Sequence, residues 1–266
     1  MRRITTVFFL VLVLFFASYQ LSVAKEGGQK MEREIIVLYD NYNYRTDLES
    51  DWGFSVYIRG FDKNILFDTG TDGSILLANM EKMGIDPQEI DIVVISHNHK
   101  DHRGGLKQLL KVNPHVQVFL IGSFFNFRRK LLERKGVKVT TVEGKVEICP
   151  GVYSSGVIKG SPNEQALILQ GEEGLTIITG CSHPGILNMI DQVDNEFEDD
   201  IFLVMGGFHL LREGERRLRR LALGMEDRGV KYLAPSHCTG SGAEEIFRNI
   251  YKARYKGLGV GRVIQI

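Results

Sequence analysis

Four side chains that bind transition metals lie close together in one short stretch of the sequence. Residues 96–105 read SHNHKDHRGG and contain His97, His99, Asp101 and His102. Alternate residues of an extended segment point the same way, so His97 and His99 are expected to face one metal ion. The chain then turns, and Asp101 and His102 are expected to supply a second ion. Imidazole nitrogen and carboxylate oxygen together suit zinc, iron or manganese.

The segments on either side of this stretch predict how it is held. The apolar run 92–95 precedes it and predicts a buried strand, and residues 106–110 follow it with the spacing of a helix. Gly104 and Gly105 are expected to allow a sharp backbone turn into that helix. The four candidate ligands are therefore predicted to lie in a tight loop between a strand and a helix.

Three other histidines follow apolar segments and have a glycine within a few residues. They are His183, His209 and His237, each near the end of a predicted strand. Because they share this setting, we expect them to point at the same place as the first cluster. Cys181 lies two residues before His183, and it is interpreted as a ligand, as a residue behind the ligands, or as a small buried side chain.

Asp68 lies just past a predicted strand, two residues before a glycine. This setting suits either a carboxylate that bridges two metals or a carboxylate that orients a ligand histidine, and we favour the second role. His115 has no comparable setting, because it lies on a turn between Pro114 and Val116. We interpret it as an ordinary surface residue.

The composition excludes some classes of function. The chain has 266 residues, 33 basic and 33 acidic side chains, and 43% hydrophobic residues, which is enough for one large domain with a proper core. A formal net charge of zero gives no basic excess for phosphate backbones, so no nucleic-acid partner is expected. The three cysteines, Cys149, Cys181 and Cys238, are too few and too widely spaced for a disulfide framework.

The first 24 residues predict export from the cytoplasm. A positive start at Arg2 and Arg3, an apolar run from Val7 to Ala17 and a small residue at Ala24 are typical of a secretory signal peptide. The alternative is an uncleaved membrane anchor, because the uncharged part approaches the length that spans a bilayer. Residues 25–32 are predicted to be a linker and residues 33–266 a single domain. In both cases the domain is expected outside the cytoplasm, in the periplasm or secreted.

The order of the predicted elements indicates the α/β class. Strands are predicted at 34–39, 53–58, 64–67, 92–95, 116–121, 137–142, 146–153, 165–169, 175–179, 201–205, 231–234 and 262–266, and helices at 73–83, 124–134, 184–193, 213–228 and 242–251. Strands dominate the first half, whereas helices separate single strands in the second. This pattern predicts two sheets packed together with helices on their outer faces.

Several of these motifs together resemble the metallo-β-lactamase fold superfamily. They are FDTG at 67–70, the histidine and aspartate cluster with its two glycines, and the later histidines. Further motifs at 40–41, 52–55, 164–167, 179–185, 206–210 and 237–240 resemble the branch of 7,8-dihydropterin-6-methyl-4-(β-D-ribofuranosyl)aminobenzene-5'-phosphate synthase. The resemblance covers the chain from about residue 34 onward. It implies an αβ/βα sandwich of two mixed sheets, with a two-metal site at one edge.

The resemblance also implies which residues hold the two divalent ions, for which zinc is the first expectation and manganese or iron the alternatives. We assign the first ion to His97, His99 and His183. We assign the second ion to Asp101, His102 and His237, with Cys181 close to both.

Two positions depart from the superfamily pattern. Many members have a ligand histidine before the strand predicted at 175–179, where this chain has Gly160 to Glu164. Many also have a bridging aspartate just after that strand, where this chain has Cys181. His183 would therefore have to replace the missing histidine.

The favoured hypothesis is an exported dinuclear hydrolase that uses metal-bound hydroxide on a phosphoester or a similar small anionic substrate. The residues predicted to be catalytic are Asp101, Asp68 and His209. His209 would face the substrate as an electrophile or proton donor, because the ordinary pKa of histidine lies near neutrality. Arg45 and Arg103 are candidates for neutralising a phosphate.

Three alternatives stay open. A transferase similar to the synthase would use the same ions to assist the departure of diphosphate. An iron-dependent oxidoreductase on the same scaffold is disfavoured by His99, because the diiron members tend to have a carboxylate there. A metal-binding protein without catalysis is disfavoured by the intact donor set.

Overall fold

The computed structural model describes residues 32–122 and 126–266. The predicted signal peptide, and all of the predicted linker except Glu32, lie outside the described residues. In the described part of the chain, no helix combines the length and the apolarity that a membrane crossing requires.

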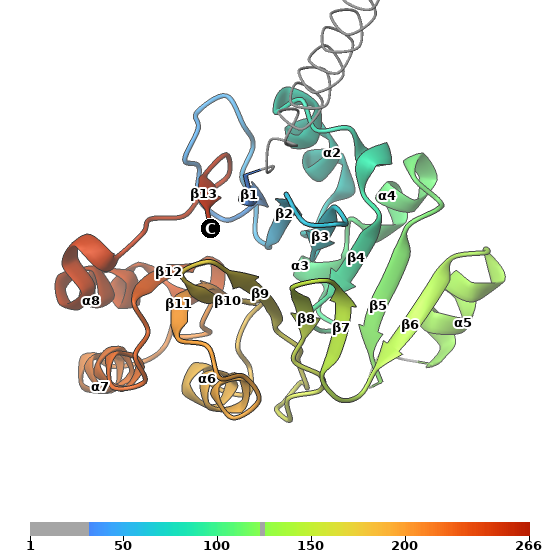
Figure 1. The fold of residues 1–266 in the computed structure, drawn as a ribbon. Coiled ribbons are helices and arrows are strands. Elements are labelled where there is room, and N and C mark those ends of the chain that lie inside the picture. The colour runs from blue at the N-terminus through green and yellow to red at the C-terminus, as the bar shows by residue number, and fades with distance from the viewer. Residues whose placement is uncertain (1–31, 123–125) are drawn as a thin grey trace, which may run out of the picture. The chain divides into compact units, whose positions relative to one another are not determined.

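The first of two sheets contains strands from the beginning of the domain and one from its end (Figure 1). Its order is β13-β1-β2-β3-β4-β5-β6. The strands are β1 (Glu34–Tyr39), β2 (Ser55–Arg59), β3 (Ile65–Phe67), β4 (Ile92–Ile95), β5 (Gln117–Ile121), β6 (Lys138–Val142) and β13 (Val263–Gln265). The pairs from β3 to β6 are parallel and the others antiparallel.

The second sheet has the order β12-β11-β10-β9-β8-β7. Its strands are β7 (Val146–Cys149), β8 (Val152–Ser154), β9 (Leu167–Gly171), β10 (Gly174–Thr179), β11 (Ile201–Gly207) and β12 (Tyr232–Ser236). β10, β11 and β12 are parallel, and the rest are antiparallel. Each sheet therefore has a parallel part, and parallel strands of this kind are usually covered on both faces.

Helices connect these strands. They are α2 (Gly73–Lys82), α3 (Lys100–Arg103), α4 (Leu106–Val112), α5 (Asn126–Arg134), α6 (Ile186–Asp194), α7 (Glu215–Glu226) and α8 (Ser241–Tyr251), with short 3-10 turns η1 (Pro87–Glu89), η2 (His237–Thr239) and η3 (Lys252–Arg254). Local signals set the ends of α2. The Asp72 side chain accepts a hydrogen bond from the Ser74 amide at 2.7 Å, and Gly84 follows the helix with a φ of 68°.

Three layers of apolar side chains hold the fold together. The middle layer joins the two sheets and includes Val94 and Met205. One outer layer packs α2 and α4 on the first sheet, through residues such as Leu76 and Leu109. The other packs α6, α7 and α8 on the second sheet. This arrangement confirms the predicted sandwich of two mixed sheets flanked by helices (Figure 1).

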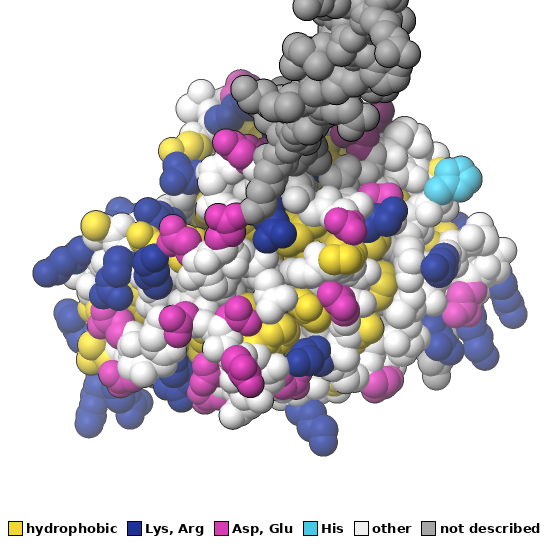
Figure 2. Space-filling model, viewed as in Figure 1, with side chains coloured by type: hydrophobic (Ala, Val, Ile, Leu, Met, Phe, Trp, Pro, Cys, Tyr) yellow, Lys and Arg dark blue, Asp and Glu magenta, His cyan; other side chains and the backbone are white. Residues whose placement is uncertain are grey.

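The surface is mixed in charge. Figure 2 shows acidic and basic side chains interspersed over the face turned toward the viewer, with apolar side chains between them. This distribution agrees with the equal numbers of acidic and basic residues in the sequence.

One predicted strand was wrong. Residues 146–153 form two antiparallel strands, β7 and β8, in which Val146 pairs with Ser154. Gly151 lies in the turn between them with a φ of 79°, a conformation that glycine adopts easily. The apolar pattern continues through the turn, so periodicity alone did not separate the two strands.

A buried asparagine attaches the loop after β1 to helix α2. The Asn79 side chain is fully buried and donates hydrogen bonds to the carbonyls of Leu38 and Glu49, at 2.9 and 2.8 Å. Its Oδ1 accepts a third from the Glu49 amide at 3.0 Å. These bonds hold both ends of the segment that carries Asn41 close to the helix.

We expect Asn79→Ala to lower the free energy of unfolding by about 2–3 kcal/mol, because the variant leaves buried backbone groups without partners. Urea denaturation measures this change. The matched control is Glu81→Ala, an exposed position in the same helix, where we expect a change within about 0.5 kcal/mol. Equal stability of the two variants would contradict the assigned role of Asn79.

Candidate metal centre

The candidate residues lie at the carboxyl ends of strands from both sheets. Asp68 follows β3, the histidine and aspartate cluster follows β4, and Cys181 and His183 follow β10. His209 follows β11, and His237 follows β12. Carboxyl ends of parallel strands are where α/β proteins commonly place their ligands. The edge shared by the two sheets therefore brings together segments that are far apart in the chain.

Gly104 and Gly105 were expected to allow a sharp backbone turn, but the structure gives a different reason for them. Gly104 has φ −61° and Gly105 has φ −74°, so both are helical and neither makes a turn that only glycine permits. A Cβ at Gly104 would instead overlap the carbonyl of Thr71, and one at Gly105 the carbonyl of Thr69. The glycines are required because two backbones approach closely there.

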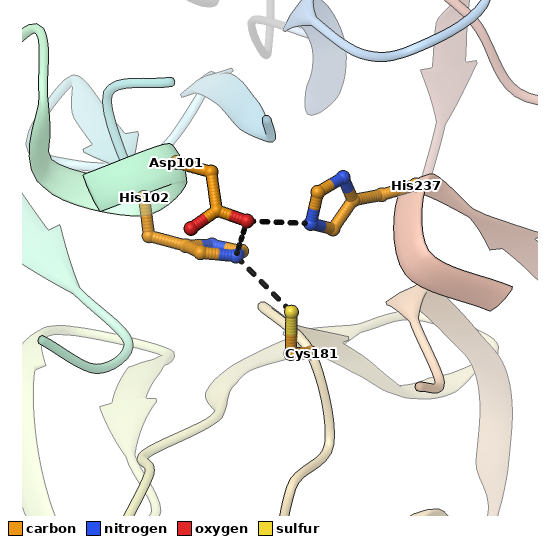
Figure 3. A group of neighbouring side chains, drawn as sticks. All are labelled: Asp101, His102, Cys181 and His237. Carbon is orange, nitrogen blue, oxygen red and sulfur yellow. Dashed lines mark hydrogen bonds and ion pairs between the residues drawn. The ribbon is translucent and has the colours of Figure 1, made fainter. Parts of the chain in front are cut away.

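Four donor side chains converge on one point in Figure 3. Asp101 and His102 come from α3, Cys181 from the loop after β10, and His237 from η2. Their possible ligand atoms all lie within 4.8 Å of one another. Nε2 of His102 is 3.2 Å from Sγ of Cys181, and Nε2 of His237 is 3.5 Å from Oδ2 of Asp101.

A second donor group shares one member with the first. It contains His97, Cys181 and His183, again with ligand atoms within 4.8 Å. His99 lies beside it, with Nδ1 only 3.0 Å from Nε2 of His97 and its ring centroid 4.8 Å from that of His183. Every residue that we assigned to the two ions is therefore part of this assembly. Cys181 belongs to both groups, and also to a third with His209 and Cys238.

Asp68 orients two of the histidines. Its Oδ2 is 2.7 Å from Nδ1 of His102, and it also accepts a hydrogen bond from the Ser96 hydroxyl. That hydroxyl lies 2.9 Å from Nδ1 of His97. With each Nδ1 engaged, the Nε2 atoms of His97 and His102 face the donor groups. Asp68 therefore lies behind the ligands, with its other oxygen bound to the Ser96 amide.

Residues of the loop between β1 and β2 hold His237 and Asp101. Oδ1 of Asn41 lies 3.0 Å from Nδ1 of His237, which leaves Nε2 facing Asp101. The Trp52 indole donates a hydrogen bond to Oδ2 of Asp101 at 2.9 Å, and its ring lies 5.0 Å from the His237 ring. Trp52 is the single tryptophan of the chain and is 46% exposed.

Two buried nitrogens show that this assembly fits metal ions. Nε2 of His183 and Nε2 of His237 are buried and have no hydrogen-bond partner among the described residues. Buried polar atoms normally have a partner, and a metal ion would provide one. The mixture of imidazole, thiol and carboxylate donors is one that zinc accepts.

The electrostatics suit cation binding. Burial and the neighbouring histidines lower the pKa of His183 to about 3 and hold that of His97 well below its usual value, so both rings are neutral donors. Burial opposes ionisation of Asp101, but its contact with the His237 ring at 3.5 Å and the charge of His102 hold its pKa below the normal range. Burial also disfavours charge on His102, yet the Asp68 carboxylate raises its pKa to about 9. Asp68 thus stabilises positive charge at this ring, whether a proton or a metal ion is bound to Nε2.

Glu164 is a site residue that we did not predict. It is fully buried and accepts hydrogen bonds from the amides of Cys181, Ser182 and His183, at 2.8, 3.0 and 2.9 Å. It lies in the region where many superfamily members have a ligand histidine. Here the carboxylate instead fixes the loop that carries two candidate ligands. The signal in the sequence was only the motif at 164–167.

The remaining candidates differ in exposure. His209 is exposed, and its ring centroid is 4.3 Å from that of His183. Its φ of 55° is a strained conformation that often marks functional positions. Arg45 pairs with the exposed Asp47, and Nε of Arg103 donates to the Asn98 carbonyl. His115 is exposed, as expected.

Three more contributors were not predicted. Asn41 and Trp52 occurred only within the motifs that resemble the synthase branch. Cys238 follows a candidate ligand directly, and its Sγ lies 3.2 Å from that of Cys181. Nothing in their local sequence showed that these side chains reach the site.

The fold is that of a known superfamily. Residues 53–195 match the model of the metallo-beta-lactamase superfamily, and the chain belongs to it. It is 28% identical to the 7,8-dihydropterin-6-methyl-4-(beta-D-ribofuranosyl)-aminobenzene-5'-phosphate synthase of Methanocaldococcus jannaschii, over 87% of this chain and 96% of the synthase.

Solved structures of the superfamily are similar over most of the chain. Tm1679, a metal-dependent hydrolase of the beta-lactamase superfamily, is 28% identical with a TM-score of 0.74, over 88% of this chain and 99% of that one. A diphosphatase of the PhnP family has the same fold, with 16% identity and a TM-score of 0.61 over 89% of this chain and 98% of that one.

We expect Asp68→Asn to weaken zinc binding by about 10–100-fold, because an amide cannot accept all the hydrogen bonds that the carboxylate accepts. Trp52 contacts Asp101 and His237, so a zinc titration followed by tryptophan fluorescence measures the affinity. The control is Asp62→Asn on an exposed turn, which should bind as the unaltered chain does. Unchanged affinity in a folded Asp68→Asn variant would exclude this role.

Proposed function

We propose that this chain is an exported, dinuclear metal-dependent hydrolase that acts on a phosphoester or a similar small anionic substrate. The observation that carries the proposal is the pair of donor groups that share Cys181. When bound, two divalent ions supply Lewis acidity and lower the pKa of water toward neutrality.

The charges of the donors support an anionic substrate. Within the two donor groups, the acidic members are Asp101 and Cys181, and the other members are histidines. One carboxylate and one thiolate cannot cancel the charge of two divalent cations. The two ions together with these ligands would therefore carry a net positive charge, which would attract an anion. Lys100 and Arg103, on either side of Asp101 and His102 in α3, add positive charge near it.

The surrounding residues support the roles proposed for the chain's own groups. Asp68 and Ser96 engage the Nδ1 atoms of His97 and His102, which leaves their Nε2 atoms available to hold the ions. Hydrogen bonding to Cys238 raises the pKa of His209, and the ring is exposed beside His183. We propose that His209 donates a proton to the leaving group.

A second candidate function is that of a synthase-like transferase. The observation that favours it is the similarity to the archaeal synthase over nearly its whole length. In that case the site would assist the departure of diphosphate. Inorganic diphosphate that is released only when a pterin substrate is also present would favour the transferase over the hydrolase.

Three histidine variants test the hydrolase. With zinc-loaded protein and a phosphodiester substrate, His99→Ala should lose metal and turnover together. His209→Ala should keep the metal and lose turnover by about 10²–10⁴-fold, which is typical of a lost proton donor. His115→Ala, on the exposed turn before β5, should keep both.

Metal analysis and initial rates measure these outcomes, with phosphomonoester, lactone and β-lactam substrates compared in parallel. Turnover that survives removal of the metal by a chelator would overturn the hydrolase proposal. Retention of metal by His99→Ala, or its loss from His209→Ala, would overturn the role assignments. Iron with redox activity would favour the oxidoreductase.

Export is part of the proposal, and it is supported by the pattern of residues 1–24. We expect the chain recovered from outside the cytoplasm to begin at Lys25, because a signal peptidase would cut after Ala24. Intact-mass measurement tests this. Full-length chain in the membrane fraction would indicate an anchor instead, and chain found only in the cytoplasm would contradict export.

A further inference from the structure

Two cysteine sulfurs meet at the inner side of the metal centre. Sγ of Cys181 and Sγ of Cys238 are 3.2 Å apart, and the Cys238 thiol donates to the Cys181 sulfur. The residues are 57 positions apart in the chain and are only 3% and 2% exposed. Both are free thiols in this structure.

The sheet explains how two distant strand ends bring their sulfurs together. Cys181 follows β10 and Cys238 lies just after β12, and β11 runs between these strands. Strands two places apart in a sheet are separated by roughly 9–10 Å. β11 ends in Gly207, where an added Cβ would lie 2.7 Å from the Cys238 sulfur. The missing side chain leaves the space in which the two thiols meet.

The separation is short enough for a bond. A disulfide has sulfurs about 2.05 Å apart, so the two sulfurs must approach each other by about 1.2 Å for the bond to form. The third cysteine, Cys149, lies on β7 at the opposite edge of the sheet from β12. Cys181 therefore has one thiol partner within reach.

We propose that Cys181 and Cys238 are a modification site, a thiol pair that a small hydroperoxide converts reversibly into a disulfide. In the first step one thiol is oxidised to a sulfenic acid, and the hydroperoxide is reduced to water or an alcohol. The second thiol then attacks the sulfenic sulfur, forms the S–S bond and releases water. Two thiols lose two hydrogens in total, and a dithiol reductant restores them.

The disulfide would disable the metal centre, an effect that rests on the proposed function. Cys181 is a member of both donor groups, and its sulfur binds a metal as the thiolate. A sulfur in a disulfide no longer has that form. Conversely, a bound ion would hold the Cys181 thiolate and protect it from oxidation. The formation of the disulfide itself does not depend on the metal.

The experiment treats the purified chain with hydrogen peroxide, before and after zinc is loaded. Free thiols are counted in denaturant, and peptide mapping identifies the linked cysteines. The matched control is Cys149→Ala, which removes a thiol that is distant from the site. Cys238→Ser removes the partner of Cys181.

In the metal-free chain we expect peroxide to leave Cys149 as the remaining free thiol, with Cys181 linked to Cys238 and both released by dithiothreitol. Cys149→Ala should form the same bond, and Cys238→Ser should form none. A wild-type chain that keeps all its thiols, or that links Cys149 instead, would overturn the proposal.

The zinc-loaded arm separates this inference from the proposed function. Oxidation slowed at least tenfold by zinc would support the link between the thiol pair and the metal centre. A disulfide that forms equally fast with zinc bound would still support the thiol pair as a modification site. It would show, however, that Cys181 is not a metal ligand.

Discussion

The buried carboxylate of Asp68 is the interaction on which the site depends. It has no exposure to solvent, and its two oxygens accept from Ser96 and contact Nδ1 of His102. These bonds connect the ends of β3 and β4 to α3, and they leave the Nε2 atoms of His97 and His102 turned toward the donor groups. Burial of a carboxylate costs free energy because the charge loses its hydration. Positive charge nearby offsets this cost, and His102 or an ion beside it provides that charge.

Cys181 joins the two halves of the site. It comes from the second sheet, whereas the cluster after β4 comes from the first, so the sandwich must assemble before the donor groups exist. Glu164 fixes this loop through three backbone amides. In many superfamily members a histidine lies in this region and an aspartate lies where Cys181 is. The two differences from the superfamily pattern are therefore adjacent in space, because the Glu164 carboxylate holds the loop that carries Cys181.

Much of the fold and most of the candidate ligands could be predicted from local pattern. Buried parallel strands appear as continuous apolar runs, as in residues 92–95, and histidines beside glycines after such runs mark strand ends. The errors were also local. β7 and β8 were merged because the apolar pattern runs through their turn, and Gly104 and Gly105 were explained by backbone freedom when close packing against Thr69 and Thr71 requires them.

Residue types and their spacing were sufficient to indicate a sandwich fold and a set of candidate metal donors, because both depend on short segments. The partners of those donors depend on contacts between segments far apart in the chain. Asp68 is 34 residues from His102, Cys181 is 57 from Cys238, and Asn41 is 196 from His237. No local pattern encodes such contacts. Sheet order, register and the space left by Gly207 determine them, and these exist only once both sheets have packed together.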